Sequence, residues 1–206
     1  VPVLIIDESV GSGEDSGDLD LANVVLSAAK GVTTVQEAPA IITVITGDEI
    51  NDRSFRNIQE IIDTVPGWLR LNALNSMLPT PLTRGTIQGN LFMHNGLSLF
   101  GPMFNIPQVW RVQPIETIKR IEMVTGPGGV LWGANSYLGV MNVITKGAED
   151  VDGIETGVRL GDGVGDKEAF RGYVMAGLPE FISEDLNVFV HAAFESTLGP
   201  ILGLPD

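Results

Sequence analysis

The sequence predicts an α+β fold, in which a compact domain of short strands and short helices is followed by longer antiparallel strands. Between residues 40 and 148, β-branched runs alternate with capped helical segments and with turns rich in Gly and Pro. Between residues 153 and 195, apolar residues instead occupy every second position in three successive runs. We therefore expect a compact domain over 38–150 and a strand-rich part over 151–206, after an N-terminal segment over 1–37.

Composition limits the classes of function. Hydrophobic residues make up 44% of the 206 residues, enough for a buried core. The formal net charge of −14 argues against nucleic acid as a partner, because phosphates repel an acidic surface. The chain has no cysteine, which excludes disulfides and thiolate metal sites. It also has no run of about 18 apolar residues, so any association with a membrane would have to use strands.

The N-terminal segment is expected to be flexible. Gly and Ser are mixed with acidic residues from Gly11 to Asp18, a composition typical of linkers. A short run that can form a strand follows, and residues 3–6 form an alternative apolar run. The run after the linker consists of Asn23, Val24, Val25, Leu26 and Ser27.

The compact domain opens with a strand and two helices. Residues 41–46 are β-branched and apolar, which favours a buried strand. Asp48 then lies where the first turn of a helix favours negative charge. A second helix is expected after Asn57, which can cap it, because Glu60 follows three residues later. The Pro-Gly pair at 66–67 is expected to end this helix.

The rest of the domain is predicted as short strands joined by loops and helical turns. Pro114 can open a short helix, because its fixed φ suits the first helical position. Glycines and a proline at 126–129 indicate a turn. The expected strands cover residues 68–72, 82–87, 90–94, 118–125 and 139–145, and the expected helical turns cover residues 115–118 and 130–133.

The last part of the chain contains three alternating runs. Each has about the length of a tilted strand that crosses a membrane, roughly nine to eleven residues. A half-buried antiparallel sheet gives the same alternation, so the pattern by itself leaves both interpretations open. The positions on the apolar face are Ile154, Thr156, Val158 and Leu160, then Phe170, Gly172, Val174, Ala176 and Leu178, and then Leu186, Val188, Val190, Ala192 and Phe194.

Catalytic and metal-binding patterns are poorly supported. The glycines at 126–129 lack the Gly-Lys-Ser/Thr end of a phosphate-binding loop. Residues 161–166 lack the terminal Glu of a calcium loop and are better explained as a hairpin connection. The two histidines, His94 and His191, lie far apart in the sequence without a nucleophile signature. We therefore expect no catalytic residue, no metal and no cofactor.

Three segments, in this order, resemble the plug domain of TonB-dependent outer-membrane receptors. Together they cover about half of the chain, and the third is the most specific. The first segment is APAIITVITGDEI at 38–50 continuing to IQEIIDTVPG at 58–67, the second is TRG at 83–85 with LFMHNG at 91–96, and the third is IKRIEMVTGP at 118–127 with LWGANS at 131–136 and GVMNVIT at 139–145.

This resemblance implies a small mixed-sheet plug domain with short helices, followed by the first antiparallel strands of a transmembrane β-barrel. It implies a receptor in the cell outer membrane, with the plug facing the periplasm inside the barrel. Such a receptor imports a siderophore, a cobalamin-like chelate, a glycan or similar cargo, and its partners are a TonB-type energy transducer, the cargo and outer-membrane lipid. Three strands cannot close a barrel, so we expect the chain to be part of a longer receptor. An adaptor in a cell-surface protein complex, without solute transport, is the alternative.

The resemblance also implies roles for particular residues. The segment 23–27 is the candidate TonB box, which would pair with the transducer by strand addition, and its alternative is a docking strand within the plug. The outward loops are expected to bind cargo, with ordinary loop packing as the alternative for each residue. The candidate cargo residues are Asn75, Ser76, Met77, Phe100, Met103, Phe104 and Asn105, and the candidate plug-to-barrel ion pairs involve Arg84, Arg120 and Glu122.

Overall fold

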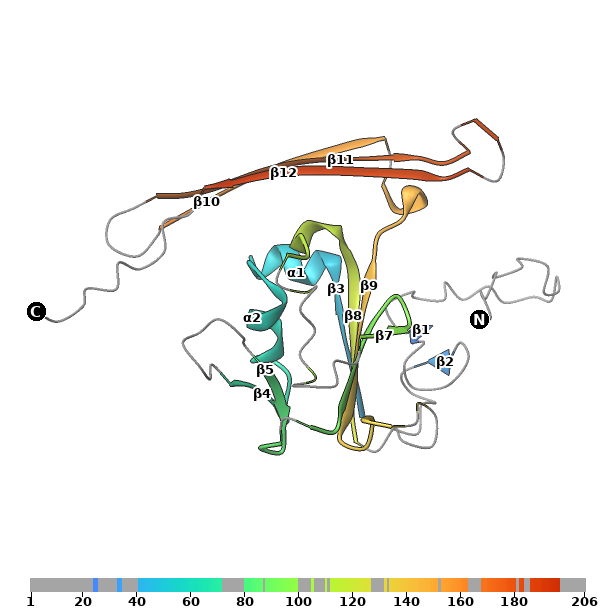
Figure 1. Cartoon of the computed structure of the whole chain (residues 1–206). Coiled ribbons are helices and arrows are strands. Elements are labelled where there is room, and N and C mark those ends of the chain that lie inside the picture. Colours follow the sequence, from blue (N-terminus) through green and yellow to red (C-terminus); the bar gives the residue numbers. More distant parts are fainter. Residues whose placement is uncertain are drawn as a thin grey trace, which may run out of the picture.

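The molecule has two parts, a compact α+β domain and a three-stranded sheet that lies across one end of it (Figure 1). The sheet is drawn above α1 in this view. The computed structural model describes residues 24–25, 33–34, 41–71, 80–86, 88–99, 105, 110, 112–126, 132, 134–151, 153–162, 168–180, 182–183 and 186–196.

A five-stranded mixed sheet organises the compact domain. Its strand order is β3-β8-β9-β6-β7, with β6 and β9 parallel and the other neighbours antiparallel. The predicted strands over 41–46, 90–94, 118–125 and 139–145 are confirmed. The bounds are β3 (Ile41–Thr46), β6 (Asn90–His94), β7 (Leu97–Ser98), β8 (Ile118–Thr125) and β9 (Gly139–Thr145).

Two small antiparallel pairs accompany this sheet, β1 (Val24–Val25) with β2 (Thr33–Thr34) and β4 (Trp68–Leu71) with β5 (Thr80–Thr83). The prediction of a strand over 82–87 was wrong in its bounds. Arg84 and Gly85 both have positive φ, at 50° and 78°, so the backbone turns where the strand was expected to continue.

Two short helices follow the capping pattern of the sequence. In α1 (Gly47–Asp52) the Thr46 hydroxyl accepts a hydrogen bond from the Glu49 N–H at 3.2 Å. In α2 (Ile58–Ile62) the Asn57 side chain accepts one from the Glu60 N–H at 3.1 Å, as predicted. The Glu60 carboxylate reaches the Arg56 N–H, one residue beyond the position of a standard capping box. The helix ends at Ile62, before the predicted stop at the Pro-Gly pair.

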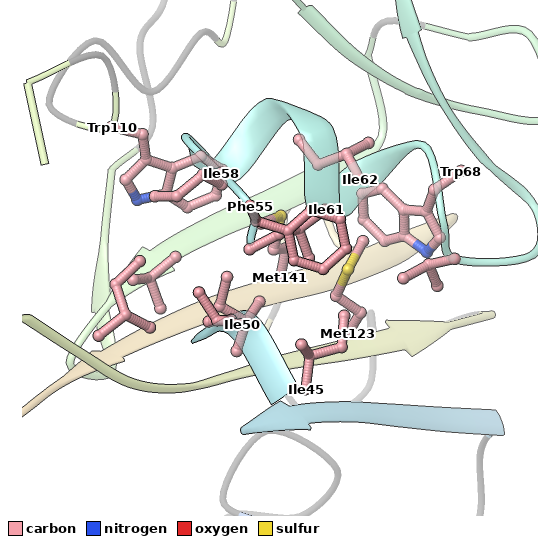
Figure 2. Packing of buried hydrophobic residues seen from close by; sticks show 14 of the residues in the cluster. Ile45, Ile50, Phe55, Ile58, Ile61, Ile62, Trp68, Trp110, Met123 and Met141 are labelled. Carbon is pink, nitrogen blue, oxygen red and sulfur yellow. The ribbon is translucent and has the colours of Figure 1, made fainter. Parts of the chain in front are cut away.

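The two helices pack on one face of the mixed sheet and enclose the main core (Figure 2). The rings of Phe92 and Trp110 meet edge to face at 5.3 Å in this core. A second, smaller cluster contains Leu91, Met93 and Val124. The labelled members in Figure 2 are Ile45, Ile50, Phe55, Ile58, Ile61, Ile62, Trp68, Trp110, Met123 and Met141.

The second part is an antiparallel meander of the three predicted strands. Its apolar positions face away from the compact domain, and Val158, Leu160 and Phe194 are 66%, 80% and 66% exposed. The polar positions face the domain instead, which is the reverse of a half-buried sheet in water. The strands are β10 (Ile154–Asp162), β11 (Glu168–Leu178) and β12 (Val188–Ser196).

Two 3₁₀ turns contact this meander from the domain side. The first, η3 (Ile115–Thr117), lies at the predicted helical turn and precedes β8. The second, η4 (Ala148–Asp150), lies in the connection from β9 to β10. At the predicted turn over 130–133, Trp132 is helical and the neighbouring residues lie outside the described ranges. No helix in the described part of the chain is long and apolar enough to cross a membrane.

Candidate functional site

A cavity of about 1140 Å³ lies between the compact domain and the three-stranded sheet. The segment from α1 to α2 and the residues around Pro114 form one wall, and β10 and β11 form the other. Its lining combines amide, hydroxyl and charged side chains, including Arg159 and Arg171, with apolar ones such as Val112 and Ile115. The cavity is slightly larger than the roughly 300–1,000 Å³ of typical small-molecule sites, and its lining is part polar and part apolar.

A buried charge cluster lies next to the cavity, around Glu116 of η3. The Glu116 side chain is 1% exposed and meets Arg171 of β11, with 2.8 Å between Oε1 and Nη2. His191 of β12 is a second partner, with 2.8 Å between its Nε2 and the Glu116 Oε1. Arg171 also pairs with Glu195 of β12. These contacts therefore connect η3 to β11 and β12.

Local structure positions Glu116 for this role. The Thr117 hydroxyl donates to the Pro114 carbonyl oxygen at 2.8 Å, and the Gln113 amide donates to the Thr117 hydroxyl at 2.6 Å. These bonds fix the local conformation of the chain through η3. Burial raises the pKa of Glu116, but hydrogen bonds from Arg171, from its own backbone and from His191 outweigh this effect, so the pKa lies below its ordinary value. The carboxylate is therefore held in its charged form.

A second bridge joins the region of α1 to β10 through Arg159. Its Nη1 donates to the Phe55 carbonyl oxygen at 2.7 Å, and its Nη2 donates to the Asn51 side-chain oxygen at 2.8 Å. Both acceptors are neutral. This bridge therefore lacks the second charge that strengthens the Glu116 cluster.

The connection between the two parts is packed closely against β11. A Cβ placed on Gly177 would lie 2.1 Å from the Ala148 carbonyl oxygen and 2.6 Å from the Val151 carbonyl oxygen. Glycine is therefore required at this point, because any larger residue would displace η4 or the strand. Nearby, the Asn187 amide donates to the Glu149 carboxylate at 3.3 Å, and Lys146 meets Glu155 at 3.5 Å.

Most of the residues that were predicted to bind cargo or the transducer lie outside the described ranges. Within the segment 23–27, the two valines of β1 pair with Thr33 and Thr34, and the other three residues lie outside. Asn105 is buried, and its amide donates to the Asn90 carbonyl oxygen at 2.7 Å. Its nitrogen thus holds the start of β6. The predicted cargo residues outside the described ranges are Asn75, Ser76, Met77, Phe100, Met103 and Phe104.

The three residues predicted for ion pairs with the barrel are found within the compact domain. Arg120 and Glu122 pair with each other along β8 at 2.9 Å, and Arg84 is exposed in the turn after β5. Sequence reasoning missed Glu116 and Arg171, which form a buried ion pair between the two parts. A signal was present, because charged residues such as Arg171 occupy the polar positions of the alternating runs, facing away from the apolar side.

Known proteins resemble the chain in sequence and in fold. The model of the TonB-dependent Receptor Plug Domain matches residues 34–140. The iron-regulated outer membrane virulence protein of Vibrio cholerae is 29% identical over 133 residues, which cover 60% of this chain and 20% of that protein. The vitamin B12 transporter BtuB of Vibrio vulnificus is 29% identical over 132 residues, which cover 63% and 22%. The chain therefore spans about a fifth of the length of these relatives.

Among solved structures, the outer membrane receptor FpvA from Pseudomonas aeruginosa PAO1, bound to pyoverdine, superposes with a TM-score of 0.65. The alignment covers 85% of this chain and 25% of that chain at 23% sequence identity. At this identity the likeness is one of fold. It extends beyond residues 34–140, because the aligned share exceeds the length of the family match.

Proposed function

The chain belongs to the TonB-dependent receptor plug domain family, and on that basis we propose that it is the plug and the first barrel strands of an outer-membrane receptor that imports cargo. The plug, residues 38–150, blocks the lumen of the barrel. Residues 151–206 begin the barrel wall. Energy from the inner membrane, delivered by a TonB-type transducer, changes the plug so that the cargo can pass through the barrel.

The orientation of the side chains on β10, β11 and β12 supports this proposal most directly. Apolar side chains point away from the plug, where Val158 and Leu160 are exposed, and polar side chains such as Arg171 point toward it. A strand of a transmembrane barrel has this pattern, because one face meets lipid and the other faces the lumen. In water the same arrangement would expose a contiguous apolar surface.

The cargo belongs to the class of siderophores, cobalamin-like chelates or glycans. Two relatives are named as an iron-regulated outer membrane protein and a vitamin B12 transporter, which are consistent with this class. The loops that include Asn75 to Met77 and Phe100 to Phe104 are the proposed contact surface for cargo, and the buried Asn105 is excluded from it. Their aromatic, apolar and amide side chains suit a bulky neutral or chelated molecule.

The proposed handle for the transducer is the segment 23–27. It precedes the plug and contains the β-capable Val24 and Val25, which can add as a strand to the edge of a partner sheet. Deletion of residues 21–30 is expected to abolish uptake and to leave cargo binding intact. Unchanged transport after this deletion would contradict the assignment of the handle.

The function itself is tested by uptake in cells that express the receptor containing this chain, with and without the energy transducer. Ferric siderophores, cobalamin and oligosaccharides serve as labelled probes. We expect one probe to bind and to accumulate in a transducer-dependent manner. Capture of a protein partner, with no uptake of any probe, would instead support an adaptor.

A further inference from the structure

Two arginines lie directly opposite each other on neighbouring strands of the meander. Arg159 of β10 and Arg171 of β11 are register partners, so their side chains project from the same face of the sheet, the one that meets the plug. Like charges at such positions destabilise a strand pair unless they are compensated. Arg171 is compensated, because its register partner on β12 is Glu195 and because Glu116 of the plug also contacts it.

Arg159 lacks a carboxylate partner of this kind. None of the ion pairs among the described residues includes it. Its Nη1 and Nη2 donate to two neutral oxygens, the Phe55 carbonyl and the Asn51 side chain. A guanidinium has more N–H donors than these two bonds use, and Arg159 lines the cavity. It therefore presents an unneutralised positive charge with spare donors to the cavity.

The strand leaves open space beside this guanidinium. Gly157 and Gly161 lie two positions before and after Arg159 in β10, so they share its face, and both line the cavity. The ring of Tyr173 covers Gly157, because a Cβ placed there would lie 2.3 Å from the Tyr173 Cε1. At Gly161, in contrast, nothing lies within 4 Å of an added Cβ. The space beside Arg159 is therefore bounded by an aromatic ring at Gly157 and open at Gly161.

The charge and the lining restrict the chemistry of a ligand. One guanidinium without a partner balances one negative charge, and its planar fork fits the two oxygens of a carboxylate. A phosphate group carries about −1.5 to −2 charges at neutral pH, and the carboxylates Glu60 and Glu195 in the same lining would repel the excess. The apolar part of the lining, which includes Val112 and Ile115, favours a ligand with an apolar body.

We propose that this cavity binds an organic carboxylate, with the carboxylate group on Arg159 and the rest of the molecule on the apolar part of the lining. The bound anion also relieves the repulsion between the two opposed arginines. The inference rests on the proposed function in one respect, because the carboxylate is assigned to the imported cargo. It adds a chemical class to that cargo and a contact site separate from the proposed loops.

The test measures equilibrium binding to the purified receptor that contains this chain. The probe is para-fluorobenzoate, followed by fluorine NMR, and the matched probe is para-fluorobenzamide, which has nearly the same shape without the charge. Arg159→Gln removes the charge, and Gly161→Val fills the open space but keeps the hydrogen bonds of Arg159 to the plug. Arg53→Gln is the control, because Arg53 lies at the end of α1, pairs with Glu49 and is absent from the described lining of the cavity.

The unmodified receptor is expected to bind para-fluorobenzoate about tenfold or more tightly than the amide, because a hydrogen bond to a charged group contributes more than a neutral one. Arg159→Gln and Gly161→Val should each weaken binding of the carboxylate, the first by about tenfold. Arg53→Gln should leave it unchanged. Equal binding of the two probes, or unchanged binding in either cavity variant, would overturn the site. Competition by inorganic phosphate as strong as that by unlabelled benzoate would overturn the choice of a carboxylate.

Failure of the proposed function gives a different result. If cells that express the receptor take up no cargo, but the purified protein binds para-fluorobenzoate through Arg159, import is wrong and the site stands. If a cargo is imported but para-fluorobenzoate does not bind, the site is wrong and import stands.

Discussion

Glu116 of η3 and Arg171 of β11 are separated by 55 residues in the sequence, and they form a largely buried ion pair between the plug and the sheet. Their side chains are 1% and 20% exposed. Removing one member of a buried pair leaves the other charge without its partner, which is costlier than losing a surface pair. The first two predictions depend on this relationship.

Glu116→Gln is expected to destabilise the attachment of the plug by roughly 3 kcal/mol, because Arg171 would retain only the more exposed Glu195 as a carboxylate partner. Denaturant unfolding of the purified receptor, followed by fluorescence, measures this change. Glu149→Gln is the control, since Glu149 is exposed and makes one hydrogen bond with Asn187. Equal effects of the two substitutions would show that burial of Glu116 has no energetic weight.

Acid should weaken the fold through the same carboxylate. The pKa of Glu116 in the folded protein lies below the ordinary value of 4.5, so the stabilisation is complete above that pH and is lost as the pH falls through the folded-state pKa. Glu116→Gln should therefore lose less stability than the unmodified protein on acidification below pH 4.5. Unfolding midpoints measured from neutral to acidic pH test this, and parallel curves for the two proteins would refute it.

Gly177→Ala should loosen the contact between η4 and β11. The added Cβ would overlap the Ala148 carbonyl oxygen at 2.1 Å, and such overpacking typically costs about 1–3 kcal/mol. Gly161→Ala in β10 is a matched control, because nothing lies within 4 Å of its added Cβ. Thermal unfolding of both variants checks the difference, and a melting temperature of Gly177→Ala equal to that of the control would count against close packing.

Several parts of this fold could be predicted from sequence because their signals are local. The strand at residues 41–46 is a β-branched run, and the start of α2 is indicated by Asn57. The end of β5 was misplaced because the chain turns at Arg84, which has a positive φ. A residue other than glycine gives no sequence signal for this conformation.

The candidate site could be predicted only in part, for a different physical reason. The meeting of Glu116 with Arg171 depends on how the meander is placed on the plug, and this is a long-range packing outcome. Alternation indicated which residues of the meander share a face, but it did not indicate which face meets the plug. The cavity depends on the same placement and has no sequence signature of its own.

The N-terminal cap of α2 offers a prediction that is independent of the sheet. Asn57→Ala removes the acceptor for the Glu60 N–H and should destabilise the plug by about 1 kcal/mol. Asn57→Asp keeps an acceptor at the same position and should restore most of the loss. Denaturant midpoints for the two variants provide the comparison. If the alanine and aspartate variants are equally stable, the cap contributes nothing.

The outward face of the meander should tolerate apolar residues and reject charge. Val174 of β11 is exposed on this face, and arginine at a lipid-facing position is expected to cost up to roughly 2–4 kcal/mol near the middle of the bilayer. Val174→Arg should therefore lower the fraction of receptor that inserts into lipid vesicles, with Val174→Ile as the control. Equal insertion of the two variants would indicate that this face does not meet lipid.

The strand order of the plug sheet has a consequence for biogenesis. The first strand of this sheet, β3, pairs with β8, and the two are separated in the chain by both helices and four other strands. The meander, in contrast, pairs only strands that are consecutive in the chain. Pairing between strands that are distant in the chain is slower than pairing between neighbours. In a chain that is still being synthesised, the apolar β3 also stays unpaired until β8 has been made. During this interval β3 is an open edge to which a periplasmic chaperone, or a second copy of the chain, can bind.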